Sequence, residues 1–125
     1  LNPDKVKAML INYPNNPLGA SCTFEYLQKV VEFCKKHDIL LMSDAAYADM
    51  YFEEEYKPHS ALEVEGAKDM TVEFHSFSKP YAMTGWRIGW VCGNKEIVQQ
   101  FAKLKSTIDS GIFKPLQKAA AKILN

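Results

Sequence analysis

The chain has 125 residues, and its 15 basic and 15 acidic side chains leave a formal net charge of zero. Hydrophobic residues make up 47% of the sequence and charged residues 24%, a balance that is typical of a folded globular protein and excludes a disordered chain. A neutral chain exerts no long-range attraction on nucleic acid or on an anionic membrane surface, and no apolar run approaches the roughly 20 residues of a membrane span, so neither partner is expected.

The first predicted element is a strand over the apolar residues 7–12, which runs into a loop rich in proline and asparagine over residues 13–19. A helix is expected next, with Ser21 or Thr23 as its N-cap. Four apolar side chains follow at the spacing of one helical face: Leu27, Val30, Val31 and Cys34. This pattern predicts a helix that packs one face against a sheet.

A second strand is predicted over residues 39–42, which are apolar on both faces and lead toward Asp44. Strand, loop, helix and strand within about 35 residues form a βαβ unit, and such a unit implies a parallel sheet with a right-handed crossover. The polar stretch over residues 53–69 is interpreted as a solvated surface connection.

Further strands are predicted over residues 71–76 and 88–92, of which the second is bounded by glycines. A helix is expected from an Asn94 cap to about residue 105, and another helix starts near Ile112. These elements together predict an α/β layered structure.

Three cysteines, an odd number without a C-x-x-C pair, predict buried free thiols in a reducing cytosol: Cys22, Cys34 and Cys92. The three histidines lack the spacing of metal ligands, so no metal site is expected. The chain starts without a methionine and stops in a sequence typical of a continuing helix. Both ends are therefore expected to be truncated, with residues 1–125 forming part of one larger domain.

Polar clusters follow three of the predicted strands: Asn15 with Asn16, then Asp44, then residues 76–79. In a parallel sheet the carboxyl ends of the strands share one edge, where loops and helix N-termini converge on ligands. We therefore expect the three clusters to line one shared pocket.

Lys79 lies among hydroxyls and bulky apolar groups, a setting that would desolvate its amine and free it as a nucleophile. A surface lysine in a turn is the alternative. Arg87 has glycines nearby that leave room for a close approach, and its guanidinium matches a phosphate that the hydroxyls of Ser76 and Ser78 would also bind. A structural pair between Arg87 and a carboxylate is the alternative.

Asp44 follows an apolar run, where an unpaired carboxylate would be costly to bury, so this side chain needs a partner. A protonated heterocyclic nitrogen would serve, as would Arg87 or Lys79, and a helix N-cap is the alternative role. Tyr47 either points its phenol into the same place or packs as a core aromatic.

Taken together, three motifs resemble the class I/II aminotransferase family of fold-type I pyridoxal-phosphate enzymes. Residues 12–19 look like that family's N-x-P-N-N-P-T-G loop, with Leu18 in place of the threonine. Residues 44–47 look like its D-x-x-Y element, and residues 76–79 followed by Arg87 look like S-x-S-K-x7-R. The motifs occur in the family's order along nearly the whole chain.

The resemblance implies part of a large domain with three layers, α/β/α, around a mostly parallel sheet. It also implies pyridoxal 5′-phosphate as the cofactor and a Schiff base between its aldehyde and Lys79, which then moves a proton between substrate and cofactor. Asp44 would pair with the protonated pyridine nitrogen. Tyr47 and Asn16 would bond to the ring hydroxyl oxygen, and Asn16 would also touch the substrate carboxylate. The phosphate would be held by Ser76, Ser78 and Arg87.

The implied function is transamination between an L-amino acid and a 2-oxo acid by a cytoplasmic homodimer, so the isolated 125-residue piece is expected to be inactive. Residues 108–113 resemble the branch that contains the LL-diaminopimelate aminotransferases. Glu73 and His75 depart from the family pattern, because they are polar in a strand of its buried central sheet. Two alternatives remain open: a pyridoxal-phosphate carbon–sulfur lyase, and a non-catalytic aminotransferase-like module that binds the cofactor.

Overall fold

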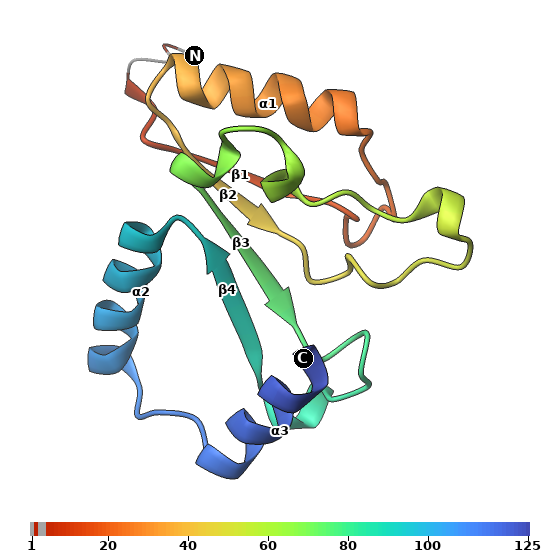
Figure 1. The fold of residues 1–125 in the computed structure, drawn as a ribbon, viewed down its shortest axis with the longest axis vertical. Coiled ribbons are helices and arrows are strands. Elements are labelled where there is room, and N and C mark those ends of the chain that lie inside the picture. Colours follow the sequence, from red (N-terminus) through yellow and green to blue (C-terminus); the bar gives the residue numbers. More distant parts are fainter. Residues whose placement is uncertain (1, 3–4) are drawn as a thin grey trace.

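Figure 1 shows the computed structural model of the protein, which describes residues 2 and 5–125. Its centre is a four-stranded sheet in the order β1-β2-β3-β4. The strands are β1 (Ala8–Asn12), β2 (Leu40–Asp44), β3 (Thr71–Ser76) and β4 (Gly89–Gly93). The first three are parallel and β4 is antiparallel to β3, which confirms a mostly parallel sheet.

Helix α1 (Phe24–Lys36) connects β1 to β2 and confirms the predicted βαβ unit. Thr23 is the N-cap, because its side-chain oxygen accepts a hydrogen bond from the backbone N–H of Tyr26 (3.2 Å). Lys35 and Lys36 occupy the last turn, where their charge complements the helix dipole. The buried residues of α1 are the four that the spacing predicted: Leu27, Val30, Val31 and Cys34.

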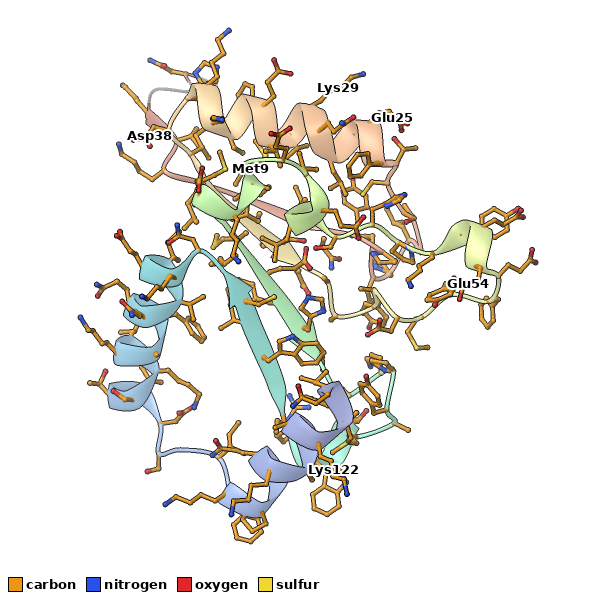
Figure 2. All side chains as sticks on the ribbon, viewed as in Figure 1. Met9, Glu25, Lys29, Asp38, Glu54 and Lys122 are labelled. Carbon is orange, nitrogen blue, oxygen red and sulfur yellow. The ribbon has the colours of Figure 1, made fainter. Side chains whose placement is uncertain are left out.

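The main hydrophobic core lies between α1 and one face of the sheet, and Figure 1 shows α1 alongside β1 and β2. Ile11 of β1 and Leu41 of β2 enter this core from below the helix. Glu25 and Lys29 lie on the exposed side of α1 and project away from the sheet (Figure 2). The helix therefore forms because one apolar stripe is buried while its charged positions stay in water.

Two short 3-10 turns, η3 (Ala61–Glu63) and η4 (Ala67–Asp69), complete the same core. Ala61 is 1% exposed and Ala67 is fully buried. The prediction that residues 53–69 form a solvated connection is therefore wrong for the second half of that stretch. Small apolar residues spaced among polar ones carry too little periodicity to reveal this packing in advance.

Helix α2 (Lys95–Ile108) follows β4, and helix α3 (Lys114–Leu124) comes after it. The Asn94 side-chain oxygen caps α2 by accepting a hydrogen bond from the backbone N–H of Ile97 (3.0 Å), which confirms the predicted cap. A second, smaller apolar cluster joins α3 to the loop before β4: Phe77, Ile88 and Ala120.

Helix α2 covers the face of the sheet opposite to α1. Leu41, which enters the α1 core, pairs with Thr71, so Phe74 three positions later points to the other face. On that face Phe74 meets Phe101 of α2 edge to face, with the ring centres 5.8 Å apart. Helix, sheet and helix thus form the three layers that the resemblance implied.

Parallel pairing brings the carboxyl ends of β1, β2 and β3 to one edge, where Asn12 pairs with Asp44 and Asp44 with Phe74. Because β4 runs the other way, its first residue, Gly89, pairs with Ser76 at the end of β3. The loop between β3 and β4 is therefore held at the same edge. This edge carries the polar clusters that the sequence analysis singled out.

Within residues 2 and 5–125, no helix is long and apolar enough to cross a membrane, and no group of three His, Cys, Asp or Glu side chains could hold a metal ion. Cys22, Cys34 and Cys92 are free thiols. Burial raises the pKa of each thiol, which keeps it protonated and a poor nucleophile.

Candidate functional site

A single side chain, that of Asn12, ties the end of β1 to the end of β2. Its Nδ2 donates to the main-chain oxygen of Asp44 (3.1 Å). Its Oδ1 accepts hydrogen bonds from Asn15 Nδ2 (3.0 Å) and from the backbone N–H of Asn16 (3.3 Å). Asn12 thus fixes the loop that carries Asn16. Asn12 had no predicted role beyond its place in the loop motif, although its position at the end of a strand was a usable signal.

Three of the predicted site residues, each from a different loop, meet beside the sheet edge. The Asn16 Nδ2 donates to the Tyr47 phenol oxygen at 2.9 Å. The Lys79 amine lies 5.7 Å from the centre of the Tyr47 ring, within range of a cation–π contact. Tyr47 is half-buried and bonded through its phenol, so it is not the core aromatic of the alternative interpretation.

Lys79 itself is exposed, which differs from the expected desolvated setting. The bulky neighbours that the sequence places beside it point elsewhere: Phe77 is 1% exposed and packs against Trp90, with the ring centres 4.9 Å apart. The apolar bulk around Lys79 therefore serves the second hydrophobic cluster rather than the amine.

Asp44 is half-buried and its Oδ1 accepts a hydrogen bond from the backbone N–H of Ala46 (3.3 Å). Residues 46–49 form turns and not a helix, so Asp44 is not a helix N-cap. Among the ion pairs of the described part of the chain, none joins Asp44 to Lys79 or to Arg87. Neither Lys79 nor Arg87 pairs with Asp44, so its carboxylate can still bind a protonated ligand nitrogen.

The phosphate-binding candidates belong to one hydrogen-bonded loop between β3 and β4. The backbone N–H of Ser78 donates to Ser76 Oγ, and the Thr84 hydroxyl donates to the Ser78 carbonyl, both at 3.0 Å. The Arg87 guanidinium donates through Nη1 to the Thr84 carbonyl (3.0 Å). Thr84 therefore links both ends of the loop, and the sequence analysis missed it because a threonine in a turn carries no distinctive pattern.

The backbone of this loop is strained at two positions. Ala82 and Arg87 have φ angles of 51° and 52°, in the left-handed region that residues other than glycine rarely adopt. The loop is held in this shape by hydrogen bonds from Phe77 N to the Ile88 carbonyl (3.2 Å) and from Met83 N to the Phe77 carbonyl (3.2 Å). Such strain costs about 1–3 kcal/mol and is typical of functional sites.

Arg87 is exposed and forms no salt bridge with a carboxylate among the described residues, so the structural-pair alternative is not realised. A guanidinium has five N–H donors, of which one goes to the Thr84 carbonyl, and the others suit an anion. The assembled edge offers an amine, a carboxylate, a phenol, hydroxyls and a guanidinium. In pyridoxal phosphate, the amine fits the aldehyde, the carboxylate fits the protonated ring nitrogen and the phenol fits the ring oxygen. The hydroxyls and the guanidinium fit the phosphate.

The sequence profile of the family described as aminotransferase class I and II matches residues 1–125. LL-diaminopimelate aminotransferase 2 of Trichormus variabilis is 50% identical over 121 residues, which cover 97% of this chain and 31% of that protein. This match agrees with the resemblance that residues 108–113 carry.

Solved structures also resemble this chain over nearly its whole length. Substrate-bound BacF from Bacillus subtilis superposes with a TM-score of 0.89 at 41% identity, and the match covers 98% of this chain and 30% of BacF. An aminotransferase from Staphylococcus aureus superposes with a TM-score of 0.88 at 37% identity, over 98% of this chain and 32% of that one. The chain thus spans about 30% of the length of these relatives.

Proposed function

The chain belongs to the aminotransferase class I and II family, and on that premise we propose that the protein it forms part of transfers an amino group between an L-amino acid and a 2-oxo acid. Pyridoxal 5′-phosphate would be its cofactor, held by the Lys79 amine until the substrate amine takes that place. The observation that carries this proposal is the contact of three loops at one strand edge, where Asn16 bonds to Tyr47 and the Lys79 amine lies over the Tyr47 ring.

Each side chain of the edge has a defined task in this proposal. The cofactor, when bound, supplies an electron-withdrawing ring that stabilises negative charge at the substrate Cα. Lys79 moves the proton at that carbon, and the Asp44 carboxylate holds the proton on the ring nitrogen. Tyr47 and Asn16 bond to the ring oxygen, and Asn16 also contacts the substrate carboxylate. The phosphate is bound by the loop residues Ser76, Ser78 and Arg87.

The proposed amino donor is LL-diaminopimelate. The support is that a relative 50% identical to this chain is named as an LL-diaminopimelate aminotransferase, and that residues 108–113 resemble that branch. Residues 1–125 form part of the cofactor-binding large domain of a cytoplasmic homodimer. Because the chain spans only about 30% of its relatives, the isolated piece is expected to be inactive.

An assay of the full-length protein tests the proposal. Incubation with LL-diaminopimelate and 2-oxoglutarate should produce glutamate, and Lys79→Ala should abolish this production while Lys103→Ala, on the exposed side of α2, should not. Release of pyruvate and ammonia from cystathionine without glutamate formation would replace transamination by carbon–sulfur lyase activity. Cofactor binding with neither reaction would support the non-catalytic module.

A further inference from the structure

Glu73, which is buried, and His75, which is half-buried, are the two polar residues that depart from the family's strand pattern, and they lie on the face of the sheet opposite to the side chains of Asp44 and Ser76. Ser43, a buried residue of β2, pairs with Glu73, whereas Asp44 pairs with Phe74. Since side chains alternate along a strand, Glu73 and His75 lie on one face and Asp44 and Ser76 on the other. The pair therefore cannot line the proposed cofactor site directly.

Three donors of the protein form hydrogen bonds to the Glu73 carboxylate. Its Oε1 accepts from the Ser60 hydroxyl (2.8 Å) and from His75 Nε2 (2.9 Å), and its Oε2 accepts from the backbone N–H of Ala61 (3.0 Å). Glu73 is 2% exposed. Burial raises the pKa of the carboxyl, but the hydrogen bonds from His75, Ser60 and Ala61 outweigh burial and leave this pKa below its usual value. The group is therefore an anion, and Nε2 of His75 carries a hydrogen.

His75 connects Glu73 to residues at the end of β3 and the start of β4. Its ring stacks on Trp90 of β4, with the ring centres 4.7 Å apart and the planes within 6° of parallel. Trp90 in turn packs against Phe77, with ring centres 4.9 Å apart. Glu73, His75, Trp90 and Phe77 thus form a continuous row from the η3 turn to the loop after β3; we call it the anchoring row.

The anchoring row alternates along the chain with the proposed phosphate ligands. His75 immediately precedes Ser76, and Phe77 separates Ser76 from Ser78. The backbone that aims both serines is therefore held from behind by side chains that are fixed in rotation: a stacked imidazole and a fully packed phenyl ring. A histidine that is both hydrogen-bonded to Glu73 and stacked on Trp90 resists rotation of the backbone more than an isolated aliphatic side chain would.

We propose that Glu73, His75 and Trp90 are positioning residues that aim Ser76 and Ser78 at the cofactor phosphate. This inference rests on the proposed function, because it assumes that the two serines bind that phosphate. Substitutions that disrupt the anchoring row should weaken binding of the phosphate more than binding of the rest of the cofactor. General loosening of the fold would weaken both alike.

The test compares two ligands on the full-length apoprotein: pyridoxal phosphate, and pyridoxal, which lacks the phosphate. Glu73→Gln keeps the size of the side chain but removes its negative charge, which weakens the charge-assisted hydrogen bonds from Ser60, His75 and Ala61. We expect the dissociation constant of pyridoxal phosphate to rise about tenfold and that of pyridoxal to change less than twofold.

Two further variants separate aiming from simple destabilisation. Trp90→Phe keeps a ring for His75 to stack on and should retain the phosphate preference, whereas Trp90→Leu should lose it. In a Ser76→Ala background, Glu73→Gln should weaken pyridoxal phosphate binding by less than it does alone, because its effect passes through Ser76. Glu32→Gln, on the exposed face of α1, is the matched control and should leave both affinities unchanged.

Equal weakening of both ligands, or no change in either, overturns the inference. If Glu73→Gln fails to fold, the Trp90→Phe and Trp90→Leu pair decides by the same affinity ratio. If the wild-type protein binds neither ligand, the proposed function itself is wrong. This outcome differs from a failure of the inference, in which the wild type binds pyridoxal phosphate but the variants do not change the affinity ratio.

Discussion

The hydrogen bond between Asn16 and Tyr47 joins two segments 31 positions apart and sets the direction in which the Tyr47 hydroxyl can donate. Because the phenol oxygen accepts from the Asn16 amide, its own hydrogen is available for a second acceptor. A ring oxygen of the cofactor, beside the Lys79 amine, is an acceptor of the right kind. The two side chains should therefore act as a unit and not as independent ligands.

This coupling predicts non-additive effects. Tyr47→Phe removes the acceptor of Asn16 and the donor to the ring, so the dissociation constant of the cofactor should rise by roughly five- to tenfold, the loss of about 1 kcal/mol. In that background, Asn16→Ala should add less than it does alone. Absorbance titration of the full-length apoprotein measures all four affinities, and strictly additive effects would refute the coupling.

Thr84 is the second prediction at this scale. Thr84→Val keeps the shape of the side chain but removes the hydroxyl that donates to the Ser78 carbonyl. The loop should lose the link between Ser78 and Arg87, which weakens cofactor binding severalfold through the phosphate. Thr107→Val is the matched control, since it also removes a hydroxyl bonded to a backbone carbonyl, on α2 away from the site. Equal affinities of the two variants would show that Thr84 has no such role.

Single residues also show where sequence reasoning stops. The motif predicted Asn16, Tyr47 and Lys79 as neighbours, because strand-end residues of a parallel sheet converge whatever the details of packing. The exposure of Lys79 could not be predicted, because apolar neighbours in the sequence can pack away from the residue that they flank, as Phe77 does. The role of Thr84 could not be predicted from the sequence either, because its hydrogen-bond partner Ser78 is six positions away across a turn.

At the scale of elements, the antiparallel pairing of β4 with β3 decides where Arg87 lies. Gly89 is the residue that permits this pairing. A Cβ at position 89 would lie 2.4 Å from the His75 carbonyl oxygen, a backbone atom that the sheet holds in place. Only glycine lets β4 start this close to the end of β3.

Gly89→Ala should therefore lower the stability of the full-length protein by several kcal/mol or prevent folding, because the clash is with backbone and cannot be relieved by rotating a side chain. Gly111→Ala is the matched control, since a Cβ there meets nothing within 4 Å. Urea unfolding monitored by circular dichroism compares the two. A Gly89→Ala variant as stable as Gly111→Ala would contradict the observed pairing.

The link between β3 and the η3 turn predicts a pH dependence. The folded-state pKa of Glu73 lies below its unfolded value of about 4.5, so its stabilising effect is present above that pH and is lost as the pH falls through the folded pKa. The free energy of unfolding of the wild type should thus fall more steeply below pH 4.5 than that of Glu73→Gln. Urea titrations between pH 3 and pH 6, about the window that this linkage covers, measure the difference. Parallel pH profiles would exclude the contribution of Glu73.

Elements were the most predictable level of the fold. The α1 face, its Thr23 cap and the Asn94 cap follow from helical spacing and from capping chemistry, which act locally. The burial of η3 and η4 was not predictable, because it depends on where β3 and α1 leave space. The Glu73 carboxylate meets donors of the η3 turn as well as His75. Long-range complementarity of this kind leaves no period in the sequence.

At the scale of the whole molecule, large apolar side chains stay exposed on the sheet, at the end of α2 and at the start of α3. Leu10 of β1 is 65% exposed, Ile108 is 72% exposed and Phe113 is 73% exposed. Apolar side chains that gather on a surface mark contact sites, and Ile108 and Phe113 lie close together along the chain. Together with the chain's span of about 30% of its relatives, this exposure supports testing function on the full-length protein.

The most direct test of the account is to find which lysine binds the cofactor. The full-length protein, loaded with pyridoxal phosphate, is reduced with borohydride, digested and analysed by peptide mass spectrometry. We predict one pyridoxyl adduct, on the peptide that contains Lys79, whose amine lies over the Tyr47 ring. An adduct on any other lysine, or no adduct on a protein that binds the cofactor, would contradict this prediction.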